Sequence, residues 1–400
     1  MQRGFIQIPI LIAILIGVAI LGGGSYFVVK EILKPPKVQI VVNEKTDVAT
    51  TQELSDGQKE ILPTAPKSSS GEVYSPTDQT NQNVVPKAPV QKEGAKTPTI
   101  PAVVAKSTAP RIAGCQIFPS DNPWNTDISK YPVHSDSAQI IDRLAKTWGI
   151  AVYTIKPYNI VDATQPLVPV NYTLYGATSD QGPMPIPQDA LYMQKTPGLN
   201  ALGQPKKLDD NHLMVVNTDS CKLYELWSVA GANSDGSWNA GSGSVYDLTS
   251  NALRPSNAAA SAASGLPIFA GLVRADEVKA GSIHHALSMT TTYTSPGYIL
   301  PATRYQPPFG KGADWDNPYN PSMGMRIRLK QDYDISGLTG QAHIVAEALR
   351  RYGAFITDGS PSSGQMAANP DPYFNIKDLS ALKQIPASAF EVVYTGEKQL

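Results

Sequence analysis

The longest run of apolar positions lies at the start of the chain. Residues 5–29 read FIQIPILIAILIGVAILGGGSYFVV and contain no charged side chain. A helix of this length crosses a hydrocarbon layer of about 30 Å. The run therefore predicts a single-pass transmembrane anchor, with residues 1–4 in the cytoplasm. Small residues at 22–25 leave open a cleaved secretory signal, but the apolar run exceeds the usual signal core of about 7–15 residues.

The next segment, residues 30–111, has no periodic apolar pattern. Between residues 35 and 110 there are ten Pro, one aromatic residue, and eight Lys against eight acidic side chains. Such a composition cannot bury a core, so it predicts a disordered linker. A flexible chain of this length spans roughly 50 Å on average. We expect it to hold a domain away from the membrane, outside the cell.

Residues 112–400 read as short apolar and aromatic segments separated by Pro and Gly. Alternating apolar and polar positions within the segments predict half-buried strands. The predicted strands are 167–175, 212–217, 221–229, 267–274, 283–293, 324–330 and 390–394. This many strands, with 34 Pro and 31 Gly in the chain, is typical of a β-rich domain rather than a helical bundle.

Two segments carry a helical pattern instead. The first begins at Ser135 or Asp136 and ends at Gly149, and the second ends before Gly353. The apolar faces are formed by Ile140, Ile141, Leu144 and Trp148 in the first, and by Ala342, Val345, Ala346 and Leu349 in the second. We therefore predict a single mainly β domain over 112–400, an antiparallel β-sandwich or jelly roll with a few peripheral helices.

The charge balance bears on the binding partner of the protein, and the cysteines bear on its cellular compartment. The 33 basic and 34 acidic side chains nearly balance, so we expect no nucleic-acid partner. In an exported domain Cys115 and Cys221 could close a long loop, and we expect them to form a disulfide. The five His show no HExxH or similar ligand spacing, and the loop 314–317 lacks EF-hand spacing. We expect no metal and no cofactor.

Several strings in the domain resemble one group of proteins. They are DNPWNTDIS (121–129), HLMVVNTDSCKLYELW (212–227), GSGSVYDLTSNALRP (241–255), GLPIFAGLVRADEV (265–278), GSIHHAL (281–287) and AFEVV (389–393). They resemble a group of secreted bacterial proteins of unassigned function. The resemblance implies an exported location and a single β-rich domain, and it supplies no catalytic residues.

Glu225 is the first candidate for chemistry. In CKLYELW the strand period places Leu223, Glu225 and Trp227 on one face. Burial between an aliphatic side chain and an indole would raise the pKa of the carboxyl, as a general acid requires. The alternative is a buried acid that pairs with an arginine of the domain.

His285 and Asp247 are the companions that we expect near Glu225. In IHHALSM the strand period places His285 on an apolar face between Ile283 and Leu287. It could serve as a base, as a substrate ligand, or as a core histidine bonded to the backbone. Asp247 could be a second carboxylate or the cap of a turn. We predict that Glu225 and His285 face one cavity, with Asp247 or Arg274 near them.

Substrate contacts can be predicted from residue type. Arg274 and Arg304 lie at strand ends, where a guanidinium can hold a carboxylate or fix a loop. Trp124 and Trp238 lie in loops rich in Gly, Asn, Asp and Pro, where an indole can stack on a sugar ring or close the end of the fold.

These expectations point to glycan chemistry outside the cell. The sequence favours a membrane-tethered enzyme that cleaves a cell-wall or extracellular polysaccharide, as a glycoside hydrolase or a polysaccharide lyase. The alternative is a non-catalytic module for glycan binding or adhesion at the cell surface. The enzyme requires several polar groups in one recess, whereas the module requires only an aromatic surface.

Overall fold

Strands make up more of the regular structure than helices in the computed structural model, which describes residues 109–193, 210–307 and 314–400. These residues all belong to one compact unit, Tyr74–Leu400. Within them no helix has the length and apolar character needed to cross a bilayer. The predicted anchor at 5–29 and nearly all of the predicted linker at 30–111 lie outside the described residues.

The first four-stranded sheet has the order β4-β6-β7-β9 and separates two cores. Its strands are β4 (Asn159–Val161), β6 (His212–Asn217), β7 (Lys222–Trp227) and β9 (Ser242–Asp247). The predicted alternation in β7 is confirmed, because Leu223 lies in the larger core and Leu226 in the smaller one. Burial of both faces explains why β6 reads as a continuous apolar run.

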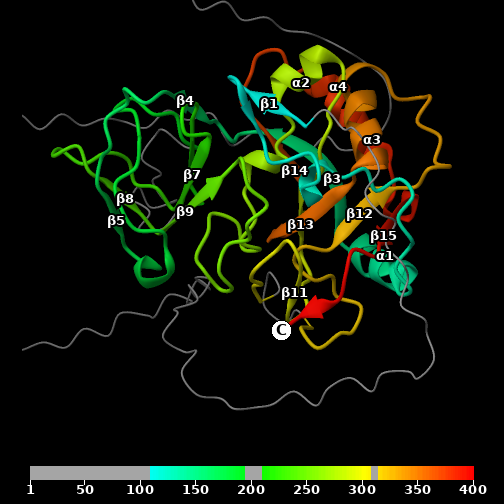
Figure 1. Cartoon of the computed structure of the whole chain (residues 1–400). Helices are drawn as coiled ribbons and strands as arrows, with labels where there is room; N and C mark the ends of the chain where they lie inside the picture. Colours follow the sequence, from blue (N-terminus) through cyan, green and yellow to red (C-terminus); the bar gives the residue numbers. More distant parts are fainter. Residues whose placement is uncertain (1–108, 194–209, 308–313) are drawn as a thin grey trace, which may run out of the picture. The chain divides into compact units, whose positions relative to one another are not determined.

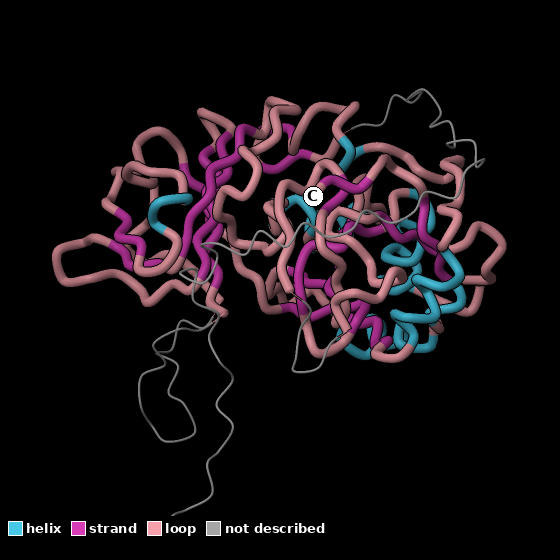
Figure 2. Tube along the Cα trace, turned by 90° about the horizontal axis from the view of Figure 1, so that it is seen from below, coloured by secondary structure: helices cyan, strands magenta, loops and turns pink. Residues whose placement is uncertain are grey.

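The second four-stranded sheet has the order β10-β13-β12-β15 and contributes to the larger core. Its strands are β10 (Leu287–Thr291), β13 (Ala354–Gly359), β12 (Arg326–Leu329) and β15 (Phe390–Val393). Helix α1 (Ser137–Ala145) contacts β15, and α3 (Gly340–Arg351) contacts β12. The helices gather around this sheet, whereas loops and short strands cover the far side of the first sheet (Figures 1 and 2).

The remaining strands of the described residues form two-stranded pairs, and two further α-helices are short. They are the pairs β1 (Arg111–Ile112) with β2 (Cys115–Gln116), β3 (Trp148–Thr154) with β14 (Ser363–Ala368), β5 (Val170–Tyr172) with β8 (Trp238–Ala240) and β11 (Tyr298–Ile299) with β16 (Lys398–Gln399), and the helices α2 (Ala275–Ala280) and α4 (Ile376–Leu379).

The strand directions correct the prediction of an antiparallel sandwich. Four ladders among the described strands are parallel, namely β10–β13, β14–β3, β4–β6 and β5–β8. Parallel neighbours need long crossover connections, and these cannot be recognised from local turn residues. The domain is β-rich with few helices, but its sheets are mixed.

Two predicted strands also change. The apolar segment 267–274 forms a 3₁₀ turn at Phe269–Gly271, and strand β10 begins only at Leu287, after both histidines of IHHALSM. The two helices lie close to where they were predicted, with Ile140, Ile141 and Leu144 of α1 buried. Trp148 does not extend the face of α1, because it begins β3.

The predicted disulfide is confirmed. Cys115 and Cys221 are joined, with their Cα atoms 5.5 Å apart and a sequence separation of 106. The bond links β2 to the residue directly before β7. It therefore ties the start of the described domain to the first sheet.

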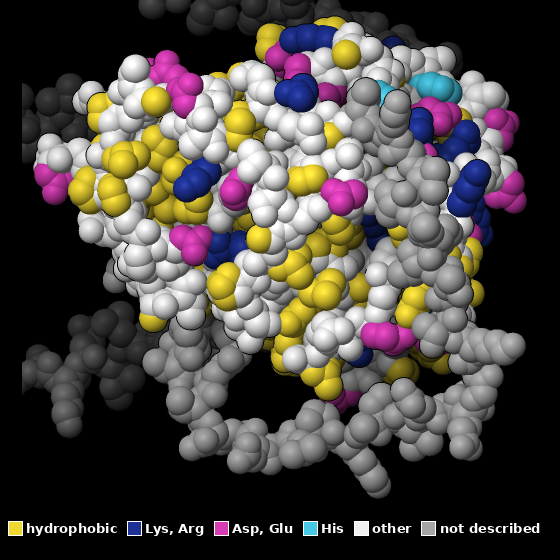
Figure 3. Space-filling model, in the orientation of Figure 1, with side chains coloured by type: hydrophobic (Ala, Val, Ile, Leu, Met, Phe, Trp, Pro, Cys, Tyr) yellow, Lys and Arg dark blue, Asp and Glu magenta, His cyan; other side chains and the backbone are white. Residues whose placement is uncertain are grey.

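The surface carries charges of both signs. On the face drawn in Figure 3, Lys and Arg side chains are interspersed with Asp and Glu side chains, and apolar side chains lie between them. This face therefore has no extended field of one sign.

Candidate functional site

Glu225 lies in the middle of β7 and is completely buried. Its Oε1 accepts a hydrogen bond from the Phe269 backbone N–H at 2.8 Å, and its Oε2 accepts one from the Ile268 N–H at 3.1 Å. The carboxyl group thus caps the 3₁₀ turn that replaces the predicted strand. The sequence analysis had offered an arginine as the partner of a buried Glu225. The hydrogen-bond donors to its carboxylate are instead these two backbone N–H groups. Burial raises the pKa of Glu225 to about 7, although the two backbone donors oppose the shift.

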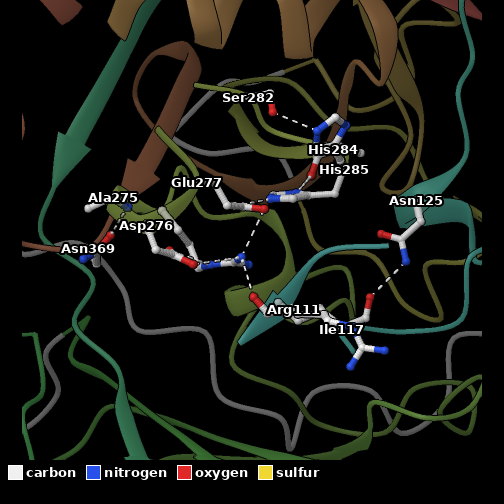
Figure 4. Close-up of polar contacts among 12 residues, drawn as sticks. Arg111, Ile117, Asn125, Ala275, Asp276, Glu277, Ser282, His284, His285 and Asn369 are labelled. Atoms are coloured by element: carbon white, nitrogen blue, oxygen red, sulfur yellow. Dashed lines mark hydrogen bonds and ion pairs between the residues drawn. The ribbon is translucent and has the colours of Figure 1, made fainter. Parts of the chain in front are cut away.

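His285 belongs to a buried triad with Glu277 and Arg274. Its Nδ1 donates to the Ala286 carbonyl at 2.7 Å, and its Nε2 lies 2.9 Å from Glu277 Oε2. The other carboxylate oxygen of Glu277 is 3.0 Å from Arg274 Nη2. Figure 4 shows the Glu277 and His285 side chains pointing toward each other, with Asp276 nearby. Burial alone would raise the pKa of Glu277, but His285 and Arg274 outweigh it and lower the pKa.

The buried triad connects separate parts of the fold. Arg274 also bonds to Asp276 and donates to the Arg111 carbonyl of β1 at 3.2 Å. Its Nε and Nη2 bond to these internal partners, and its Nη1 has no hydrogen-bond partner in the described residues. Because the side chain is completely buried, the guanidinium is closed to a substrate. Of the two roles expected for Arg274, its position agrees with fixing a loop and excludes holding a carboxylate of a ligand.

Asp247 lies at the exposed end of β9, away from any such network. Its Oδ1 accepts from the Thr249 N–H at 2.9 Å and from the Thr249 hydroxyl at 2.6 Å, so it caps a turn. In the described residues no hydrogen bond or ion pair joins Asp247, Glu225 and His285. The structure therefore does not bring the three predicted catalytic residues together.

The two loop tryptophans are also packed inside the molecule. Trp124 is buried in the larger core against Phe355, with ring centroids 4.8 Å apart, and Trp238 is buried in the smaller core against Tyr192 at 6.0 Å. Their faces are covered by protein, so a sugar ring cannot stack on them.

A second group of charges lies on half-buried or exposed positions. We define the charged cluster as Lys156, Asp210, Arg304 and Asp358. Lys156 follows β3, Asp210 precedes β6, and Asp358 lies near the end of β13. The Lys156 ammonium interacts electrostatically with the carboxylates of Asp210 and Asp358, and Arg304 interacts with Asp358. The positive charge of Lys156 also acts to lower the pKa of Glu225 against the larger effect of burial.

Asp210 is held by two neighbours at the ends of β6 and β7. The Trp227 indole N–H donates to Asp210 Oδ1 at 2.9 Å, and His212 Nε2 lies 3.0 Å from the same oxygen. The Asp210 side chain is 69% exposed, yet desolvation by surrounding protein acts strongly on it. The half-buried rings of Trp227 and Tyr175 lie 6.1 Å apart and form an aromatic pair beside it.

The two carboxyl groups of the charged cluster titrate in opposite directions. Burial and the neighbouring Asp210 raise the pKa of Asp358 to about 7. Desolvation would also raise the pKa of Asp210, but His212, Lys156 and the Trp227 indole outweigh it and lower the pKa. At neutral pH one carboxyl is therefore partly protonated while the other is ionised. Two such groups can divide the roles of general acid and base.

The sequence analysis named Glu225 and Arg304 as candidates, and it did not name Lys156, Asp210 or Asp358. Each of the three is an ordinary polar residue at the end of a strand or of a turn, and no local motif marks it. The one available signal is the period of β7, which places Trp227 at the end of the same face as Glu225.

The described residues hold no group of three or more His, Cys, Asp or Glu side chains arranged to bind a metal ion. Comparison with known proteins adds no further assignment. No protein-family model matches the chain, and neither a curated protein nor a solved structure shows significant similarity to it.

Proposed function

We propose that this chain is a membrane-tethered, extracytoplasmic protein that cleaves a cell-wall or extracellular polysaccharide at the charged cluster. The observation that carries the proposal is the Trp227 indole, half-buried and bonded to the exposed Asp210 carboxylate at 2.9 Å. An aromatic face beside a carboxylate is a common composition of a sugar-binding site, because the ring stacks on the sugar and the carboxylate binds its hydroxyl groups. The apolar run at 5–29 and the linker at 30–111 would hold this site outside the cell.

The proposed chemistry assigns one role to each carboxyl. Asp358, with its raised pKa, would protonate the oxygen of the leaving sugar. Asp210 remains ionised. It would either activate a water molecule as the base or attack the sugar carbon of the cleaved bond as the nucleophile. His212 and Trp227 hold the Asp210 carboxylate in place. Glu225 lies behind the site, where its two backbone bonds fix the turn 268–271.

The experiment is an assay of the full chain against a panel of polysaccharides. New reducing ends report hydrolysis, and the ultraviolet absorbance of unsaturated ends reports elimination by a lyase. Asp358→Asn should lower the rate by at least about 100-fold, because loss of a general acid typically costs this much or more. Asp247→Asn is the matched control and should keep the rate, since Asp247 only caps an exposed turn.

Two results would count against the proposal. If every polysaccharide of the panel is neither cleaved nor bound, the charged cluster is not a glycan site. If Asp358→Asn and Asp247→Asn lower the rate equally, the assignment of the acid fails.

The aromatic pair supports a second function, a non-catalytic module for glycan binding or adhesion. The rings of Tyr175 and Trp227 could provide a stacking surface without any proton transfer. Binding of a glycan without cleavage, weakened by Trp227→Ala and retained in Asp358→Asn, would favour this module over the enzyme.

A further inference from the structure

Ser282 and His284 form a pair of side chains that the proposed glycan site does not use. The Ser282 hydroxyl lies 2.8 Å from His284 Nε2. Figure 4 shows the two side chains pointing toward each other. Both are half-buried, so part of each side chain is accessible. A serine hydroxyl at this distance from an imidazole nitrogen can transfer its proton to the ring and act as a nucleophile.

The end of helix α2 fixes the position of Ser282. Gly281 ends the helix in the left-handed conformation, with a φ of 87°, which a residue without a Cβ adopts readily. The Ser282 N–H donates to the Glu277 carbonyl of the same helix at 3.2 Å. The serine is therefore held at a defined point of the fold, as a reactive group requires.

The His284 ring has a second neighbour in Tyr352, which is buried at the end of α3. His284 Nδ1 lies 3.5 Å from the Tyr352 hydroxyl, and the two ring planes make an angle of 81°. An Nδ1–H directed at this hydroxyl leaves Nε2 free to accept the Ser282 proton. The adjacent His285 cannot take this role, because its Nε2 bonds to Glu277 in the core. His284 is thus placed as a general base, with Tyr352 as its positioning residue.

A backbone donor follows the serine directly. Among the described residues, the Ile283 N–H has no hydrogen-bond acceptor. In one large class of serine hydrolases, the N–H of the residue after the nucleophile binds the oxyanion of the tetrahedral intermediate. The Ile283 N–H occupies this position in the chain and is available for the same contact.

We infer that Ser282 and His284 form a nucleophile–base pair that hydrolyses a carboxylic ester. Ser282 Oγ would attack the carbonyl carbon while its proton moves to His284 Nε2, and the leaving alcohol would then take that proton. Water would next attack the acyl–serine, release the acid and return a proton to Ser282 through His284. This activity goes beyond the proposed glycan cleavage, because the bond broken is that between a carbonyl carbon and an ester oxygen.

The test treats the full chain with diisopropyl fluorophosphate, which phosphorylates a reactive serine and releases fluoride. Peptide mass spectrometry should locate the adduct on Ser282. The chain should also hydrolyse p-nitrophenyl acetate faster than buffer does. Ser282→Ala and His284→Gln should each lower that rate by at least about 100-fold, the usual cost of losing a general base or its nucleophile. Tyr352→Phe should lower kcat and leave KM unchanged.

His343→Gln is the matched control, because His343 lies on α3, is 43% exposed and has Glu347 as its neighbour. It should keep the wild-type rate. Circular dichroism of each variant establishes that the fold is kept.

Two results would overturn the inference. One is the absence of any adduct on Ser282 of the wild-type chain at excess reagent, a result that depends on no variant. The other is an equal rate of ester hydrolysis in His284→Gln and His343→Gln. Neither result bears on glycan cleavage at the charged cluster.

Discussion

Glu277→Ala is expected to lower the free energy of unfolding by about 3–5 kcal/mol, the usual result of removing one partner from a buried ion pair. Glu277 lies between Arg274 and His285, both of which are completely buried. Without the carboxylate, the Arg274 charge loses its buried partner and His285 Nε2 loses its bond. Urea unfolding at neutral pH measures the change.

Asp276→Ala is the matched control, because Asp276 pairs with the same arginine but is 46% exposed. Its loss should cost within about 1 kcal/mol, as for other solvent-exposed pairs. Equal losses in the two variants would show that burial does not set the strength of the buried triad.

The same network predicts a pH dependence of definite sign. The pKa of Glu277 is lowered in the folded protein, so the unfolded chain binds its proton more readily. The contribution of Glu277 to stability is therefore complete above the ordinary glutamate pKa and is lost as the pH falls through the folded value. The difference between the wild type and Glu277→Ala should narrow in acid.

Replacement of both cysteines by Ala is the second change with a large expected effect. A cross-link between residues 106 apart restricts the unfolded chain, and the chain-entropy model gives about 4–5 kcal/mol for such a loop. The midpoint of urea unfolding under non-reducing conditions should fall accordingly. Reductant should lower the midpoint of the wild type and leave that of the double variant unchanged. An unchanged midpoint in the double variant would contradict the stabilising role of the Cys115–Cys221 bond.

Local patterns predicted the elements that depend on local interactions. The alternation of β7 and the apolar face of α1 are set by neighbouring residues, and both were recognised in the sequence. The structure of segment 267–274 was not recognised, because its apolar run resembles a strand. In the folded protein the Ile268 and Phe269 N–H groups donate to Glu225, and the segment forms a turn instead. These two hydrogen bonds join residues more than forty positions apart, and the apolar pattern of neither segment indicates them.

The candidate site was harder to predict for the same reason. Lys156, Asp210, Arg304 and Asp358 come from four distant segments, and only Asp358 lies within a strand, so no strand period links them in the sequence. Conversely, His285 and Arg274 looked like site residues because a polar group in an apolar segment is unusual. Both side chains bond to Glu277 inside the core, so this buried ion pair network accounts for the polar residues in the two apolar segments.

The central claim is that a glycan binds at the charged cluster beside Trp227 and Tyr175. Its most direct test is hydrogen–deuterium exchange of the full chain with and without the tightest-binding oligosaccharide of the panel. The account predicts slower exchange at residues 210–211 directly before β6, at the end of β7 and in β13. Slower exchange confined to β5 and β8, or no change on adding a glycan that binds, would place the ligand elsewhere and contradict the account.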